Sequence, residues 1–186
     1  IGFQNLGAKF DFDSHTKIFS VSAKKLKGAY MLLDEASVTG TANIIMAAAL
    51  AEGTTTIYNA ACEPYIQQLC KMLVSMGAKI SGIGSNLLSI TGVSKMTGCT
   101  HTMLPDMIEV GSFIGLAAMT QSDIIIKNVG LEHLGVIPER FQQLGIQMDF
   151  PGDDIHIPAQ EMYEIQKYMD GGVLTIYDHP WPGFTP

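Results

Sequence analysis

Residues able to bind an anion stand at the first of three junctions between a strand and a helix. The junction 34–40, with the sequence Asp-Glu-Ala-Ser-Val-Thr-Gly, combines two hydroxyls with the unpaired backbone N–H groups that begin a helix. Such N–H groups and the helix dipole attract phosphate. The alternative is that Ser37 or Thr39 only caps the helix, as these residue types commonly do. The junction therefore predicts either an anion site or an ordinary helix start.

Acidic residues occupy the two later junctions. Glu63 lies between Cys62 and Pro64. A cysteine at a helix N-terminus can have a lowered pKa, and a glutamate beside it can transfer protons. Asp106 and Glu109 are three residues apart, so they share one side of a helical turn. The alternative for both junctions is structural, with an acid favoured in the first helical turn, an ordinary cysteine and a capping aspartate.

The histidines and cysteines do not indicate metal or redox chemistry. The five histidines are scattered along the chain, and the three cysteines show no C-x-x-C or Cys/His ligand spacing. We therefore predict no metal and no cofactor. The odd number of cysteines and the lack of an export signal favour a reduced, cytoplasmic compartment. His179 differs from the other histidines because it begins the proline-rich loop 179–186, and rigid loops at strand ends often carry function.

Composition and charge exclude several classes of protein. Apolar residues make up 47% of the 186-residue chain and charged residues 16%, as in a globular rather than a disordered protein. The net charge is −7 and Arg140 is the only arginine, whereas nucleic-acid and anionic-membrane surfaces need clustered Lys and Arg. No apolar run reaches the ~20 residues of a membrane span. We therefore expect neither nucleic acid nor a membrane as a partner.

A sequence unit of nearly 70 residues recurs along the chain and must position these junctions. The phrases 6–10, 76–80 and 144–148 each place a glycine after an apolar helix end, and the glycines lie 70 and 68 residues apart. Asn59 and Asn128, each following a run rich in β-branched residues, are 69 residues apart. Landmarks of different kinds that keep one spacing indicate a structural repeat.

Each unit is predicted to run strand, helix, strand, helix, strand, strand, which defines an α/β fold. A second full copy is expected over 100–159, where Gly135 and Pro138 make its second helix start late and 151–154 form the turn of its final hairpin. The middle copy is expected to have strands at 27–34, 54–58, 78–81 and 87–91, and helices at 37–51 and 64–76.

The two ends of the chain hold only parts of further copies. Residues 1–23 supply a helix end and a hairpin, and residues 173–186, after the polar connector 160–172, supply an opening strand and a loop. The spacing of the repeat therefore suggests that the chain is part of something longer, incomplete at both ends. Uncovered strand edges and apolar helix faces predict marginal stability or self-association.

Four phrases resemble the enolpyruvyl transferase family, in particular its members that use UDP-N-acetylglucosamine. They are 37–48, 59–64, 104–111 and 182–186, in the family's order and spacing. The resemblance implies an inside-out α/β barrel of repeated βαβαββ units and an active site in the cleft between two lobes. It assigns 1–102 to the UDP-sugar-side lobe, as a partial unit plus one full unit. It assigns 103–186 to the second lobe, as one full unit plus the start of the next, with a crossover strand around 100–104.

The resemblance also implies a reaction. The family moves the enolpyruvyl group of phosphoenolpyruvate, in these members to the 3′-hydroxyl of UDP-N-acetylglucosamine, for peptidoglycan synthesis. This activity would link the chain to cell-wall biogenesis, cell shape, the cell cycle and cell division. The residues that match the UDP-sugar-binding stretch are Glu35, Ala36, Ser37, Val38 and Thr39. Those that match positions near the cleft or its hinge are Glu63, Asp106, Thr185 and Pro186.

No catalytic residue is expected within these 186 residues. By the resemblance, the reactive cysteine loop would precede Ile1 and the catalytic aspartate would follow Pro186. None of the three cysteines matches the reactive one. A single arginine cannot hold both the phosphate and the carboxylate of phosphoenolpyruvate. The isolated chain is therefore predicted to be inactive.

Some residues depart from the family's pattern and leave other interpretations open. Glu35 stands where many members have a basic or apolar residue, and Cys62 replaces a usual arginine. An acid at position 35 argues against diphosphate contact by that side chain but not by the backbone of 36–38. One alternative is a fragment of the shikimate-pathway enolpyruvyl transferase, which shares the fold. Another is a non-catalytic UDP-sugar-binding or scaffold module. An RNA-end-processing protein built on similar units is disfavoured by the charge.

Overall fold

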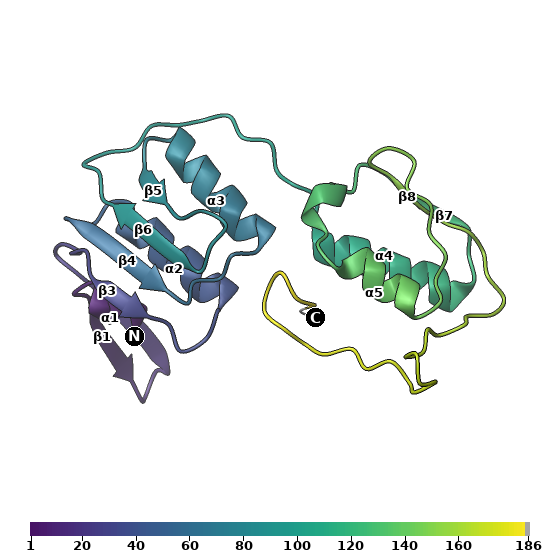
Figure 1. Cartoon of the computed structure of the whole chain (residues 1–186). Helices are drawn as coiled ribbons and strands as arrows, with labels where there is room; N and C mark the ends of the chain where they lie inside the picture. The colour runs from purple at the N-terminus through teal and green to yellow at the C-terminus, as the bar shows by residue number, and fades with distance from the viewer. Residues whose placement is uncertain (185–186) are drawn as a thin grey trace. The chain divides into compact units, whose positions relative to one another are not determined.

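The computed structural model describes residues 1–184 and contains two compact units, Ile1–Thr102 and Met103–Pro186 (Figure 1). Each unit is described by itself below. Thr185 and Pro186, two of the predicted site residues, lie outside the described residues. Over residues 1–184, no helix is long and apolar enough to cross a membrane.

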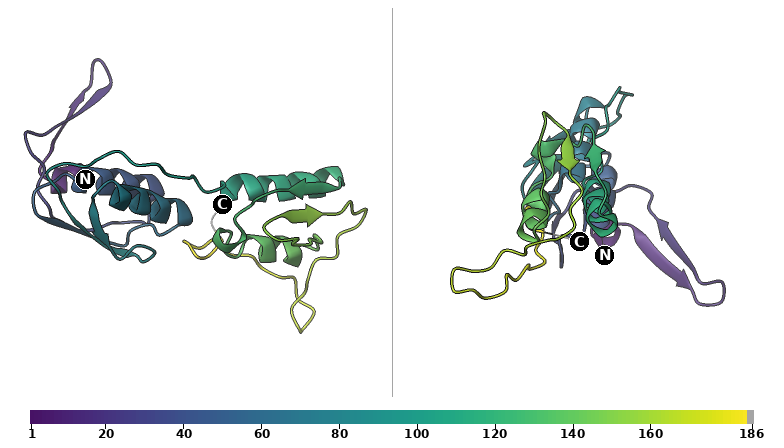
Figure 2. Two further views of the ribbon diagram at one scale, coloured as in Figure 1. Left: turned by 90° about the horizontal axis from the view of Figure 1, so that it is seen from above. Right: turned by 90° about the vertical axis from the view of Figure 1, so that its right-hand side faces the viewer.

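Unit 1 is built on a four-stranded sheet with one helix-covered face. The strand order is β3-β4-β6-β5; β3 and β4 are parallel and the other pairs are antiparallel. Two helices, α2 and α3, pack side by side against this sheet (Figures 1 and 2). The elements are β3 (Tyr30–Leu32), α2 (Val38–Ala48), β4 (Thr54–Tyr58), α3 (Pro64–Ser75), β5 (Lys79–Ser81) and β6 (Leu87–Thr91). This order is the predicted strand, helix, strand, helix, strand, strand.

Alternation along the strands explains why one face is buried. In β4 and β6 every second side chain is buried, as a half-covered sheet requires. Ile57, Leu88 and Ile90 point into a core completed by apolar residues of both helices. Ser37 begins α2 and Pro64 occupies the first turn of α3, where its missing N–H costs no hydrogen bond.

Unit 1 also contains a separate hairpin. The short helix α1 (Gly2–Asn5) leads into β1 (Lys9–Asp13), which pairs antiparallel with β2 (Ile18–Ser22). Figure 2 shows this hairpin projecting from the rest of the unit. Its Phe12 and Phe19 rings stack at 4.5 Å, yet Phe19 remains 65% exposed.

Unit 2 repeats this arrangement with fewer regular strands. It contains α4 (Met107–Thr120), β7 (Ile124–Ile126), a short 3-10 helix (Leu131–His133), α5 (Ile137–Gln143) and β8 (Ile155–Ile157). β7 and β8 are antiparallel, as β4 and β6 are in unit 1. The second helix starts late, as predicted, with Pro138 in its first turn. The strand that would correspond to β5 is reduced to a single bridge between Asp149 and His156.

Several predicted strands are shorter or missing. The strand expected at 27–34 is regular only over β3, with a single bridge at Lys27. Residues 100–104 form no strand, because within the described residues no neighbouring strand pairs with them. The Thr102 carbonyl accepts a hydrogen bond from the Gln68 side chain at 3.4 Å. The opening strand expected after residue 173 is replaced by isolated bridges at Val173 and Asp178.

The backbone confirms the repeat at the three glycines. Gly7, Gly77 and Gly145 have φ values of +91°, +105° and +89°. In each copy the glycine N–H donates to the carbonyl three residues earlier, and the next N–H donates to the carbonyl five residues earlier. This pairing is the Schellman motif, in which a left-handed glycine ends a helix. Asn59 and Asn128 share a second left-handed position, with φ values of 60° and 53°.

Candidate functional site

The first junction forms a capped helix start. Ser37 has an extended backbone, and its Oγ accepts a hydrogen bond from the Gly40 N–H at 3.2 Å. Its carbonyl accepts the Thr41 N–H at 2.9 Å. The capping alternative is therefore observed, because the side chain satisfies one of the free donors of α2.

The cap leaves other groups of this junction open to a ligand. Among the described residues, the backbone N–H groups of Ser37, Val38 and Thr39 donate to no protein acceptor. The side chains of Glu35 and Thr39 are exposed, and Ala36 to Val38 are half-buried. A set of free N–H groups at the N-terminus of an 11-residue helix can hold an anionic oxygen. Capping and anion binding are thus compatible here.

The second junction buries an acid. Glu63 immediately precedes α3, is only 4% exposed and makes no side-chain cap bond to its helix. Its Oε2 has no hydrogen-bond partner among residues 1–184. A buried carboxylate oxygen without a partner is costly, which makes Glu63 the most unusual of the predicted positions.

The surroundings of Cys62 do not activate its thiol, in contrast to the reactive cysteine that the sequence suggested for this junction. Burial, and after it the charge of Glu63, raises the pKa of the Cys62 thiol. Desolvation and a neighbouring acid both disfavour a thiolate, and together they outweigh the helix N-terminus. The hypothesis of a lowered pKa at Cys62 is therefore wrong.

The third junction follows the capping alternative. The Asp106 Oδ1 accepts a hydrogen bond from the Ile108 N–H at 2.8 Å, and Glu109 lies exposed in the first turn of α4. Asp106 and Ser37 therefore occupy equivalent positions, 69 residues apart, in the two units. The structure thus brings residues 35–39 together in one turn, while Glu63 begins a separate helix and Asp106 lies in unit 2.

Sequence reasoning missed one polar cluster. The His156 Nε2 lies 3.2 Å from an Asp123 carboxylate oxygen, and its Nδ1 lies 3.5 Å from Asp149. His156 lies in β8, Asp123 directly precedes β7, and Asp149 pairs with His156 in an isolated bridge. These sequence separations match no short motif. Within residues 1–184, no group of three or more His, Cys, Asp or Glu side chains is arranged to hold a metal ion.

The repeated α/β units define a class of fold that solved structures share. An enolpyruvyl transferase, NikO from Streptomyces tendae, superposes with a TM-score of 0.76 and 17% identity, over 94% of this chain and 45% of that one. EPSP synthase from Acinetobacter baumannii superposes with a TM-score of 0.61 and 21% identity, over 89% and 40%. The fold is that of the enolpyruvyl transferases, the inside-out barrel inferred from the sequence.

The chain belongs to the EPSP synthase (3-phosphoshikimate 1-carboxyvinyltransferase) family, whose model matches residues 1–183. Among curated relatives, the UDP-N-acetylglucosamine 1-carboxyvinyltransferase of Bacteroides thetaiotaomicron is 66% identical over all 186 residues. Those of Porphyromonas gingivalis and Treponema denticola are 63% and 47% identical. The chain spans 43% of the length of each of these relatives.

Proposed function

We propose that this chain is part of an enzyme that transfers the enolpyruvyl group of phosphoenolpyruvate to the 3′-hydroxyl of UDP-N-acetylglucosamine, releasing phosphate. The observation that carries the proposal is the 66% identity, over every residue of the chain, to a transferase named for that sugar nucleotide. The same relation supports a role in peptidoglycan synthesis, and through it in cell shape, the cell cycle and cell division, in the cytoplasm. A fragment of the shikimate-pathway enzyme is less favoured, because its solved relative shares only 21% identity.

The assignment of the two units to lobes belongs to the same proposal. Residues 1–102 would be part of the UDP-sugar-side lobe, and 103–186 part of the second lobe. The separate apolar core of unit 1 and the capped start of α4 just after residue 102 are consistent with a lobe boundary there.

Residues 35–39 are proposed to bind the UDP-sugar. The free N–H groups of Ser37, Val38 and Thr39 would donate to its anionic diphosphate or to its hydroxyls. The Ser37 Oγ accepts from Gly40, but its own O–H remains available as a donor. Glu35 is exposed and negatively charged, so contact by the backbone is favoured over contact by that side chain.

The acidic positions have a different proposed role. One carboxylate oxygen of Glu63 is buried and has no hydrogen-bond partner among residues 1–184. An oxygen of this kind is expected where the partner is present only in another state of the protein. Asp106 is tied to the first turn of α4. Both are proposed to lie near the hinge of the complete enzyme.

We propose that the cationic groups that hold phosphoenolpyruvate lie mainly outside this chain. Arg140 is the only arginine, and its Nη1 already lies 2.8 Å from Gln143 and 3.7 Å from Glu139. Holding a phosphate and a carboxylate during the transfer requires several such donors. These donors would come from other parts of the complete enzyme.

A chimera tests the proposed sugar-nucleotide site. This chain replaces the aligned segment of the Bacteroides thetaiotaomicron relative, and phosphate release is measured with UDP-N-acetylglucosamine as the varied substrate. Ser37→Asp keeps a cap but places a negative charge beside the diphosphate. We expect it to raise KM for the sugar nucleotide by about tenfold or more. KM for phosphoenolpyruvate should stay unchanged.

The matched control is Ser112→Ala, which removes an exposed hydroxyl that donates to its own helix α4. It should leave both KM values unchanged. If Ser37 only caps α2, Ser37→Asp should behave like the control, because Asp and Ser cap equally well. An unchanged KM for UDP-N-acetylglucosamine in Ser37→Asp would therefore contradict the proposed site.

A further inference from the structure

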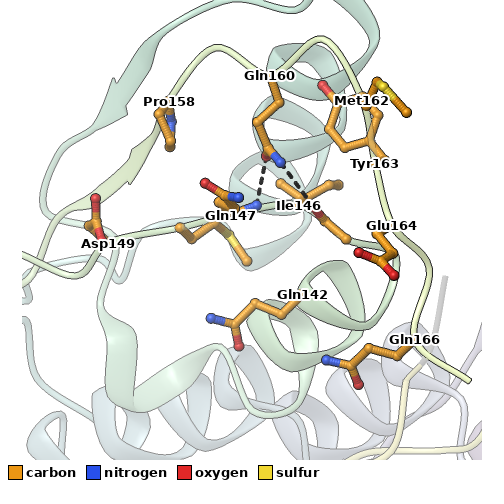
Figure 3. Close-up of a pocket in the computed structure, with 12 residues that line it drawn as sticks. Gln142, Ile146, Gln147, Asp149, Pro158, Gln160, Met162, Tyr163, Glu164 and Gln166 are labelled. Carbon is orange, nitrogen blue, oxygen red and sulfur yellow. Dashed lines mark hydrogen bonds between the residues drawn. The ribbon is translucent and has the colours of Figure 1, made fainter.

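The polar connector of unit 2 borders an open cavity that the proposed function does not use. The cavity measures about 890 Å³, within the range of small-molecule sites. Three stretches line it: the end of α5, residues 145–149, and Pro158 together with the start of the connector, 160–166 (Figure 3).

Specific hydrogen bonds fix the connector in place. The Gln160 Oε1 accepts from the Gln147 N–H at 2.7 Å, and its Nε2 donates to the Gly145 carbonyl at 3.1 Å (Figure 3). One side-chain amide thus pairs with the backbone as a neighbouring strand would. Farther along, the Gln166 N–H donates to the Gln143 carbonyl at 2.9 Å. These bonds give the cavity a formed wall.

Close packing at Gly145 shows that, of the three equivalent glycine turns, only the one in unit 2 carries such a wall. A Cβ added at Gly145 would lie 2.6 Å from the backbone N and O of Glu164. At the equivalent glycines, Gly7 and Gly77, an added Cβ would meet no atom within 4 Å. The connector therefore rests directly on the left-handed turn of Gly145, which has room for it because glycine has no side chain.

Three of the four glutamines that line the cavity are exposed and have side-chain amides without a partner in the described part of the chain. Gln142, Gln147 and Gln166 line it, and their side chains make no hydrogen bond within residues 1–184. In Figure 3, Gln142 and Gln166 lie across from Gln147 and Gln160. Each free amide can donate two hydrogen bonds and accept two. Such groups match a ligand rich in both donors and acceptors.

The charges of the lining select against anions. Asp149 and Glu164 are its only charged residues, and both are acidic. Ile146 and Met148 also line the cavity but are buried, and the exposed apolar side chain of the lining is Met162. Nucleotides, phosphates and carboxylates are therefore disfavoured, whereas a neutral ring with hydroxyls and an apolar face fits the lining.

We propose that this cavity binds a saccharide that carries no negative charge. Hydroxyls of the sugar would pair with the amides of Gln142, Gln147 and Gln166, while Glu164 would accept from a further hydroxyl. The ring face would rest on the exposed side chain of Met162. The site lies wholly within unit 2 and does not depend on the UDP-sugar site proposed for unit 1.

Nuclear magnetic resonance of the full 186-residue chain tests this site. Three matched probes are titrated separately: N-acetylglucosamine, which is neutral, glucosamine, which is cationic, and N-acetylglucosamine 1-phosphate, which is anionic. We expect the neutral sugar to shift the amide signals of Gly145, Gln147, Glu164 and Gln166 at millimolar concentrations. The cationic sugar should bind there at least as well as the neutral one, because both charged lining residues are acidic, and the anionic probe at least about tenfold more weakly.

Two variants and a control locate the binding. Gln142→Leu combined with Gln166→Leu should weaken binding of N-acetylglucosamine by about tenfold or more, with unit 2 still folded by its spectrum. Gly145→Ala should weaken it as well by displacing Glu164. Gln4→Leu, an exposed glutamine of unit 1, should have no effect. No shift in the cavity, shifts only at residues 35–39, equal binding of the anionic probe or unchanged binding in the double variant would each overturn the proposal.

Discussion

At the scale of residues, Ser37 and Asp106 show how one structural task is met by two side chains. Each begins a helix in an equivalent position, and each accepts a backbone N–H of its own first turn. Caps depend on local sequence, so both could be anticipated as alternatives to a functional role. The burial of Glu63 could not, because acids at helix starts are usually exposed and only the packing of a whole unit buries this one.

The cap of α2 predicts a measurable loss of stability. Ser37→Ala should lower the free energy of unfolding by about 1 kcal/mol, because a donor of the first turn loses its partner. Ser37→Asp, which restores a cap, should remain within a few tenths of the parent. Urea unfolding followed by circular dichroism measures both variants. Equal losses for the two variants would show that the serine hydroxyl does not act as a cap.

The cysteines should differ in reactivity according to their burial. Burial raises the pKa of the Cys70 thiol to about 11, from an ordinary value of 9.0, whereas Cys99 is exposed. The thiolate is the reactive form. An aromatic disulfide reagent at mildly alkaline pH should therefore label Cys99 first and Cys70 last. In Cys70→Ala, one slowly reacting thiol equivalent should disappear. Loss of a rapidly reacting thiol equivalent instead would contradict the prediction that Cys70 reacts last.

The raised pKa of Cys70 also fixes the direction of a pH effect on stability. The folded state holds this thiol protonated while the unfolded chain ionises it near its ordinary pKa of 9.0. Its contribution is therefore complete below about that pH and declines as the pH rises toward about 11. The measurement compares the free energy of unfolding of the parent chain and of Cys70→Ser between these two pH values. If the parent loses stability no more steeply than Cys70→Ser, the assigned pKa shift is contradicted.

At the scale of elements, the repeat explains both what the sequence allowed us to predict and what it did not. Glycine and asparagine landmarks have backbone requirements of their own, so they marked helix and strand ends correctly in both units. The strands expected at 100–104 and after 173 were not formed, because a strand also needs a partner ladder that local sequence cannot reveal. Irregular connector geometry, including the Gln160 bonds, likewise depends on contacts made after folding.

Two of the equivalent glycines should respond differently to the same change. Gly77→Ala should cost about 1 kcal/mol, because alanine strains the left-handed backbone but meets open space. Gly145→Ala should cost clearly more, because its Cβ also collides with the backbone of Glu164. Urea unfolding of both variants, followed separately for each unit, gives the comparison. Equal losses of unfolding free energy in the two variants would show that the connector moves away from the added Cβ without a loss of stability.

The β1–β2 hairpin should mediate self-association of the chain. Phe19 occupies the position that corresponds to Leu88 of β6 in the repeat, yet Phe19 is 65% exposed and Leu88 only 1%. Because no helices cover this position in the hairpin, its apolar side chain stays exposed and can pack against another copy of the chain. Phe19→Lys should therefore raise the monomer fraction in analytical ultracentrifugation. The control Ile125→Lys changes an exposed position in β7 of unit 2 and should raise the monomer fraction less. Equal effects of the two variants would contradict a role of the hairpin in self-association.

At the scale of the whole molecule, two units of one repeat carry different parts of the proposed chemistry. The free N–H groups beside Ser37 belong to unit 1, whereas the connector cavity belongs to unit 2. The net charge of −7 and the single arginine led us to expect no nucleic-acid partner, and we propose that the groups holding phosphoenolpyruvate lie in other parts of the complete enzyme. Family and fold were therefore accessible from sequence, because motif order and repeat spacing survive where individual contacts vary.

The most direct measurement is phosphate release from phosphoenolpyruvate by the chimera with the Bacteroides thetaiotaomicron relative, compared between two acceptors. We expect release with UDP-N-acetylglucosamine, none with shikimate 3-phosphate, and none with either acceptor from the isolated 186-residue chain. A folded chimera that releases phosphate only with shikimate 3-phosphate, or with neither acceptor, would contradict the proposed activity. Turnover by the isolated chain would contradict the claim that the cationic groups lie elsewhere.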